Sequence, residues 1–124
     1  MNERIIPITL KVPTQAAGAN LAGVKLPVIG TLVGVSASLD AVTGGPTDVK
    51  YDLLSAGSNI SGFNAISVGT TAAATTLTKS KHFGGTIDPV EIAAGNNLTV
   101  STTITGGSSP TAGLTVVLYL LMGE

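Results

Sequence analysis

The sequence predicts an all-β protein: a single antiparallel β-sandwich, jelly-roll-like, with an extended N-terminal arm. Sixteen glycines and six prolines divide the 124 residues into short segments, and β-branched residues dominate between them, which is typical of short strands joined by tight turns. Apolar and polar residues alternate in several of these segments, and none shows a sustained helical period. A chain of this length suits one domain.

The N-terminal segment is expected to lie outside the centre of any sheet. Arg4 to Val12 is extended, but it contains Pro7 and is closed by Pro13. Because proline cannot donate to a central ladder, this segment is predicted to be an edge strand or an arm that reaches a partner. We assign residues 1–26 to this arm and its loop, and residues 27–124 to the sandwich domain. An arm of this kind would be dispensable for folding.

Three internal segments alternate as half-buried strands do. Their core-facing residues are expected to be Val33, Val35, Ala37 and Leu39, then Val49, Tyr51 and Leu53, then Leu98, Val100, Thr102 and Ile104. The stretch 67–81 gives little core signal because alanine and threonine dominate it, so it is expected to be a long loop holding a short strand. Phe83 is expected to return the chain to the core.

The last strand is apolar on both faces. Leu114, Val116, Leu118 and Leu120 point one way, and Thr115, Val117, Tyr119 and Leu121 point the other. An antiparallel sheet that faces water on one side normally shows a polar face there. The second face therefore requires cover from another layer or another copy of the chain. We predict an oligomer interface formed by Val117, Tyr119 and Leu121.

The composition disfavours several classes of partner. Charged residues make up 10% of the chain, against about 25% in ordinary domains, which suggests a surface covered by partners or coated with threonine, serine and glycine. The formal net charge is −1 and the basic residues are scattered, so nucleic-acid binding is disfavoured. The sequence shows neither a signal peptide nor an apolar run long enough to span a membrane. Synthesis in a reducing cytoplasm is consistent with the absence of cysteine.

No residue pattern indicates catalysis, a metal or a cofactor. His82 is the only histidine, and its simplest placement is a loop beside Phe83. Asp48 and Asp52 lie four apart and could bind a cation with Asp40, but their spacing fits a solvated strand face with local ion pairs better. We therefore expect a protein that is not an enzyme and has no cofactor.

Several segments resemble a β-sandwich module found in structural proteins of tailed bacteriophages. They are residues 31–37, 49–54, 92–100, 106–107 and 112–120. The resemblance implies a virion structural protein. Because the chain has no coiled-coil heptads or fibrous repeats that could form a shaft, a capsid decoration or cement protein is a better match than a fibre.

The expected function is to stabilise a phage head by binding across major capsid protein subunits on the capsid surface, as a homotrimer made in the host bacterial cytoplasm. The N-terminal arm would add a strand to a capsid edge, with Ile5, Ile6, Ile8 and Leu10 as its anchors. The alternative is a receptor- or glycan-binding module of a tail fibre or spike. The shortage of aromatic residues, four in all, counts against this alternative.

Overall fold

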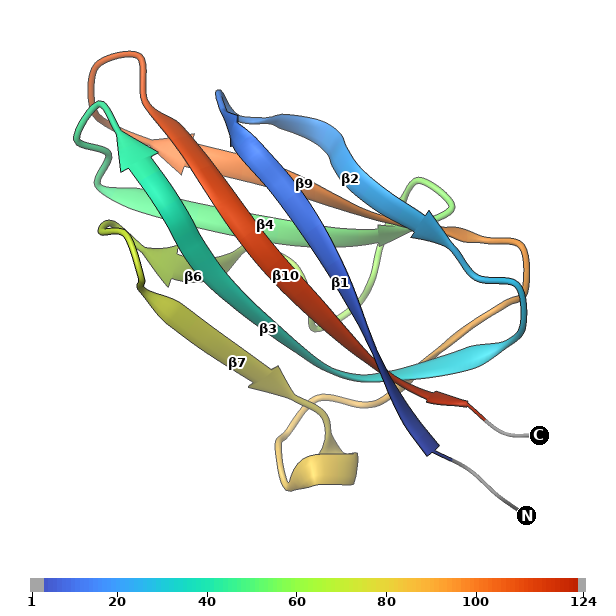
Figure 1. The fold of residues 1–124 in the computed structure, drawn as a ribbon. Helices are drawn as coiled ribbons and strands as arrows, with labels where there is room; N and C mark the ends of the chain where they lie inside the picture. The colour runs from blue at the N-terminus through green and yellow to red at the C-terminus, as the bar shows by residue number, and fades with distance from the viewer. Residues whose placement is uncertain (1–3, 123–124) are drawn as a thin grey trace.

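The computed structural model, which describes residues 4–122, is a sandwich of two antiparallel sheets (Figure 1). Sheet A has the order β1 (Arg4–Gln15), β10 (Thr111–Met122), β3 (Gly30–Thr43) and β7 (Thr75–Lys79), and β8 (Val90–Ile92) also pairs with β3. Sheet B has the order β2 (Gly18–Lys25), β9 (Asn97–Thr105), β4 (Asp48–Ser55) and β5 (Ser58–Asn59), and β6 (Ile66–Gly69) also pairs with β4. A short 3₁₀ turn, η1 (Lys81–Phe83), follows β7.

The strand order confirms the predicted jelly-roll-like sandwich. The chain passes from β1 in sheet A to β2 in sheet B, then to β3 in A and β4 in B, and the later strands fill the gaps between the earlier ones. In this way β10 lies between β1 and β3, and β9 lies between β2 and β4. Such interleaving of two Greek keys is the jelly-roll arrangement.

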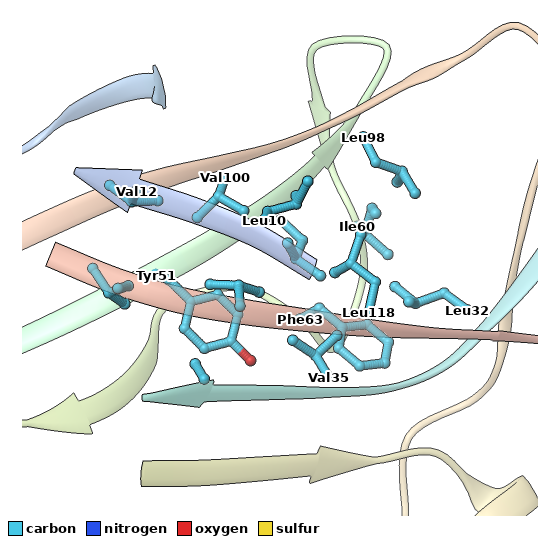
Figure 2. Packing of buried hydrophobic residues seen from close by; sticks show 14 of the residues in the cluster. Leu10, Val12, Leu32, Val35, Tyr51, Ile60, Phe63, Leu98, Val100 and Leu118 are labelled. Atoms are coloured by element: carbon cyan, nitrogen blue, oxygen red, sulfur yellow. The ribbon is translucent and has the colours of Figure 1, made fainter. Parts of the chain in front are cut away.

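The core lies between the sheets and follows the predicted alternation. The inward side chains of β10, β4 and β9 are buried, except for the half-buried Ile104, and they meet Phe63 and Ile60 from the loop after β5 (Figure 2). In β3 the alternation is broken by a bulge, because Tyr119 pairs with Gly34 while the next residue, Leu120, pairs with Leu32. Both Leu32 and Val33 are therefore buried, where a regular strand would expose one of them.

The free N-terminal arm is not confirmed, because its residues form strands of both sheets. β1 pairs with β10 from Arg4 to Gln15, and β2 pairs with β9. Leu10 and Val12 are buried in the core. Of the two alternatives that the prolines allowed, the structure has the edge strand: β1 is the outermost strand of sheet A, where the missing N–H of Pro7 breaks no central ladder.

Two further expectations differ from the structure. The stretch 67–81 contains the end of β6 and all of β7, so it contributes one strand to each sheet. Its weak apolar signal has a physical reason, since β7 is a short edge strand that buries little. Phe83 is not a core residue: its side chain is 42% exposed on η1. Tyr51, which is also predicted to lie in the core, is fully buried.

Two glycine-containing turns pack closely against each other at one end of the sandwich. Gly44 and Gly107 both have positive φ angles, +84° and +78°. A Cβ on Gly107 would lie 2.4 Å from the carbonyl oxygen of Gly44. That same oxygen accepts a hydrogen bond from the backbone N–H of Ser108 at 2.8 Å. The β3–β4 and β9–β10 turns can therefore approach this closely only without a side chain at residue 107.

The buried Tyr51 predicts a loss of stability at alkaline pH. Burial raises the pKa of its phenol, and the nearby Thr78 side chain offsets part of that rise without reaching hydrogen-bond geometry to the Tyr51 oxygen. Because the folded pKa exceeds the unfolded value of about 10, stability is complete below pH 10 and falls as the pH rises toward the folded pKa. Denaturant unfolding from neutral pH to about pH 11 should show this fall, and Tyr51→Phe should reduce it. An equal fall in both proteins would contradict the assignment.

Candidate functional site

The two outer faces of the sandwich differ in polarity, and the outer face of sheet B is the polar one. Its outward residues include Lys50, Asp52, Thr99, Ser101 and Thr103. Two of them bond to neighbouring segments: Asp52 accepts the N–H of Ala65 at 2.6 Å, and Thr99 donates to the Asn20 side chain of β2 at 2.7 Å. This face has the composition of an ordinary solvated sheet.

The outer face of sheet A is apolar at its centre. The register of its four main strands places the outward residues in three rows across β1, β10, β3 and β7. The rows are Pro7, Tyr119, Gly34 and Lys79; then Thr9, Val117, Ser36 and Leu77; then Lys11, Thr115, Ser38 and Thr75. No other segment of the described chain forms a layer over this face (Figure 1).

A groove runs along β3 in this face, because β3 contributes only small outward residues. Its floor is Gly34, Ser36 and Ser38. We call the neighbouring outward residues along β10, which are Thr115, Val117 and Tyr119, the ridge. Two hollows make up the groove, one of about 300 Å³ over Gly34 and one of about 370 Å³ over Ser36 and Ser38. They are continuous, since Leu77 and Tyr119 line both.

Two aromatic rings flank the end of the groove at Gly34. A Cβ built on Gly34 would lie 3.6 Å from the Tyr119 ring and 3.7 Å from the Phe83 ring. Phe83 reaches this position from η1, which begins where the Ser80 hydroxyl accepts the N–H of His82 at 3.2 Å. The turn closes at Gly85, where any Cβ would lie 2.0 Å from the carbonyl oxygen of Lys79. Leu77, 57% exposed, forms the opposite wall.

Part of the margin of this face is polar. Lys11 lies 3.4 Å from an Asp40 carboxylate oxygen, which also accepts a 2.7 Å hydrogen bond from the Thr115 hydroxyl. These three residues connect β1, β10 and β3 at one end of the groove, and Lys79 lies at the other end. An apolar centre within a polar rim is the usual anatomy of a protein–protein interface.

A second apolar surface lies at the end of sheet A where the described chain begins and ends (Figure 1). Ile5 pairs with Leu121, and Leu121 pairs with Thr31 of β3. The loop that leads into β3 carries Val28 and Ile29, which are 50% and 52% exposed. We call Ile5, Val28, Ile29 and Leu121 the terminal patch. Val28 and Ile29 are exposed, while Ile5 and Leu121 are half-buried, so large apolar residues at this end of sheet A suggest a contact surface.

Solved structures with this fold include chains of two phage capsids. A chain in the capsid asymmetric unit of cyanophage Pam1 overlays with a TM-score of 0.52 at 15% identity, over 98% of this chain and 86% of that chain. A chain in the acidic stable capsid structure of Helicobacter pylori bacteriophage KHP30 gives 0.51 at 12% identity, over 98% and 97%. A family 35 carbohydrate-binding module from Clostridium thermocellum gives 0.43 at 14% identity, over 93% and 90%. The two capsid chains are similar to this chain in fold.

The two capsid chains are matched over most of their length, so both are close to this chain in size. No protein-family model matches the sequence, and no curated protein matches it.

The predicted interface residues are divided between the two sides of sheet A. Val117, Tyr119 and Leu121 lie together on the outer face, half-buried among their neighbours. Ile5 shares that face, whereas Ile6, Ile8 and Leu10 point to the inner side, where Leu10 is buried. In this fold only Ile5 of the four expected anchors faces outward. Contact of the outer residues with a partner or another copy stays a prediction.

The sequence reasoning missed the groove and half of the terminal patch. The alternation Gly34, Ser36, Ser38 places these residues on the outer side of β3, but a groove follows only when large residues flank those small ones. That requires the pairing of β3 with β10 and β7, which local sequence does not reveal. Val28 and Ile29 carried a signal that could have been used, since they are two large apolar residues in a segment next to Pro27.

The candidate metal ligands do not come together. Asp40 lies on β3 in sheet A, while Asp48 and Asp52 lie on β4 in sheet B. Asp48 accepts from the Ser67 hydroxyl and lies 3.7 Å from the Lys50 ammonium. Within residues 4–122, no three acidic or histidine side chains are placed to share a metal ion. The exposed His82 ring meets the Phe83 ring edge-on, 5.0 Å between centroids.

The described residues contain no helix that is long and apolar enough to cross a membrane.

Proposed function

We propose that this chain is a structural virion protein, not an enzyme, that decorates or cements a phage capsid. It binds across neighbouring major capsid protein subunits on the capsid surface and self-associates, as the homotrimer expected from the sequence or as a dimer. The observation that supports this proposal is the match, over nearly whole chains, to two chains of similar size in phage capsid structures.

The surface of the molecule supports the same proposal. One sheet has a polar outer face, and the other has an apolar centre within a polar rim. Only 10% of the residues are charged, so the chain has little of the surface charge that keeps free proteins apart. A molecule with one wet and one apolar face is suited to attachment on one side and exposure to solvent on the other.

The mechanism is burial of apolar area at the seams between capsid subunits. Each contact of a few hundred Å² contributes several kcal/mol at roughly 25 cal/mol per Å², before the cost of association. Many symmetry-related copies act together, so modest contacts become a large avidity. We assign the capsid contact to the terminal patch, because Val28 and Ile29 are the most exposed large residues at that end of sheet A.

A double substitution tests this assignment. Val28→Asp with Ile29→Asp places two carboxylates in the proposed contact, and capsid binding is expected to fall at least ~10-fold. The measurement is co-sedimentation with capsids of the encoding phage that have been stripped of this protein. Because both side chains are half-exposed in a loop, folding stability should change by less than about 1 kcal/mol. Thr103→Asp on the polar face of sheet B is the matched control and should bind normally.

Full capsid occupancy by the double variant would contradict the assignment of the capsid contact to the terminal patch. Failure of the wild-type protein to bind capsids at all would overturn the function itself.

The second candidate is a receptor- or glycan-binding module of a tail fibre or spike. The observation that favours it is the hollow over Gly34, flanked by Tyr119 and Phe83, since aromatic rings pack on sugars. Against it, Lys79 is the only charged residue of the described chain that lines the hollow, and none of the described carboxylate or amide side chains lines it. Binding of the wild-type protein to a glycan array, lost in Tyr119→Ala, would favour this function.

A further inference from the structure

The geometry points to a second copy of this chain as the occupant of the groove, docked by a two-fold rotation. This inference deepens the self-association within the proposed function and does not depend on capsid binding. The three rows of outward residues on sheet A have a common asymmetry. In each row the β10 residue is larger than its β3 partner: Tyr119 beside Gly34, Val117 beside Ser36, and Thr115 beside Ser38.

A face of this kind is complementary to itself. Consider a two-fold axis that runs along the strands, midway between β10 and β3, in the plane between two facing sheets. The rotation leaves each row at the same position along the strands and reverses the order of its residues across the strands. As a result, β10 of one copy lies over β3 of the other. Tyr119 then lies over the hollow at Gly34, and Val117 lies over Ser36. The ridge of each copy enters the groove of its partner, as an isologous interface requires.

The other two-fold arrangement fits less well. An axis across the strands would place β10 over β10 and β3 over β3. Ridge would then meet ridge, while the two grooves would face each other as an empty channel. Facing sheets pack by interdigitating large and small side chains about 10 Å apart, so the first rotation is the one that fills the hollows.

The charges on the face also permit this pairing. The rotation places Lys79 over Pro7 of the other copy, and Lys11 over Thr75. No two like charges oppose each other in the three rows. Lys11 keeps its ion pair with Asp40 within its own copy, at the rim where water remains.

The available area is that of a stable dimer. β1 and β10 each have 12 residues and β3 has 14, so with usual strand spacings the whole face, with Ile5 and Leu121 of the terminal patch included, measures roughly 650 Å² per copy, or about 1,300 Å² for the pair. Specific stable interfaces bury about 1,200–2,000 Å² in total. A three-fold ring would divide this face between two neighbours and leave each contact with roughly half of that area, below the usual range.

A charge-swap experiment tests the contact. Val117→Lys and Ser36→Asp are made in separate chains, and mass in solution is measured by sedimentation velocity across the micromolar range. The wild type should be a dimer, and each variant alone should self-associate at least ~100-fold more weakly. In a mixture, the introduced lysine of one chain faces the introduced aspartate of the other, while the second contact of the dimer stays wild-type. The mixture should therefore form 1:1 heterodimers.

Two controls separate this contact from misfolding. Thr103→Lys on sheet B should remain a dimer, and the circular dichroism of each variant should match that of the wild type. If Val117→Lys fails to fold, the pair Leu77→Lys and Thr9→Asp replaces it, because both residues are exposed and face each other across the same axis.

A wild-type monomer or trimer, variants that still form dimers alone, or a mixture without heterodimers would each overturn the inference. A wild-type monomer whose capsid binding is lost in Val117→Lys would assign the groove to the capsid partner. Dimers that behave as expected but do not bind capsids would uphold this contact while the proposed function fails.

Discussion

Deletion of residues 1–13 is expected to leave the chain unable to fold. The deletion removes most of β1, which pairs with β10 along its length, and it removes the buried Leu10 and Val12 from the core. Truncation of one buried leucine to alanine typically costs about 2–5 kcal/mol, and whole domains are stable by only about 5–15 kcal/mol. Loss of two core residues and most of an edge strand should exceed that margin.

The measurement is soluble yield with circular dichroism and thermal unfolding. A matched pair of point variants gives the graded version of the same test. Leu10→Ala should destabilise the protein by about 2–5 kcal/mol, while Thr9→Ala, next to it on the outer side, should change stability by less than about 0.5 kcal/mol. Cooperative unfolding of the deletion variant would instead support the interpretation, suggested by the prolines, that this segment is an arm dispensable for folding.

The second large effect is expected from Gly107→Ala. The new Cβ would lie 2.4 Å from the Gly44 carbonyl oxygen and 3.0 Å from the backbone of Gly45 and Pro46. Backbone atoms cannot swing aside as the end of a side chain can, so one of the two turns must move. The positive φ of +78° adds a conformational penalty of about 1–2 kcal/mol, and overpacking adds about 1–3 kcal/mol. We expect a loss of about 2–5 kcal/mol in unfolding free energy.

Gly45→Ala is the control that separates these two contributions. Gly45 also has a positive φ, +64°, but nothing lies within 4 Å of its Cβ position. Denaturant unfolding should therefore show only the conformational penalty, about 1–2 kcal/mol. Equal losses in both variants would mean that the close approach of the turns contributes nothing to stability.

Most of the sandwich could be predicted from sequence because its central strands alternate cleanly. Val49, Tyr51 and Leu53 of β4 are all buried, and so are the inward residues of β10. In these strands apolar residues recur at every second position, and this spacing predicts which side chains face the core. The apolar outer face of β10 was likewise visible in Val117 and Tyr119.

The features that escaped prediction depend on contacts between distant segments. β1 was ambiguous because its prolines allow an edge strand or an arm, and only its pairing with β10, more than a hundred residues later, decides between them. Phe83 is large and apolar, which predicts a core position, yet its actual position follows from the close turn at Gly85. The groove exists only because β3 lies between β10 and β7.

The strands β1 and β10 of the sandwich are paired with each other, and this pairing has a consequence for synthesis in the cell. While the chain emerges from the ribosome, the pairing of β1 and β3 with their shared neighbour cannot form until β10, which follows them in the sequence, has been synthesised and inserts between them. Long-range pairing of this kind is slow to form and follows the local turns. The outer face that carries the ridge therefore cannot form until β10 has been synthesised, so shorter nascent chains lack the surface proposed for self-association.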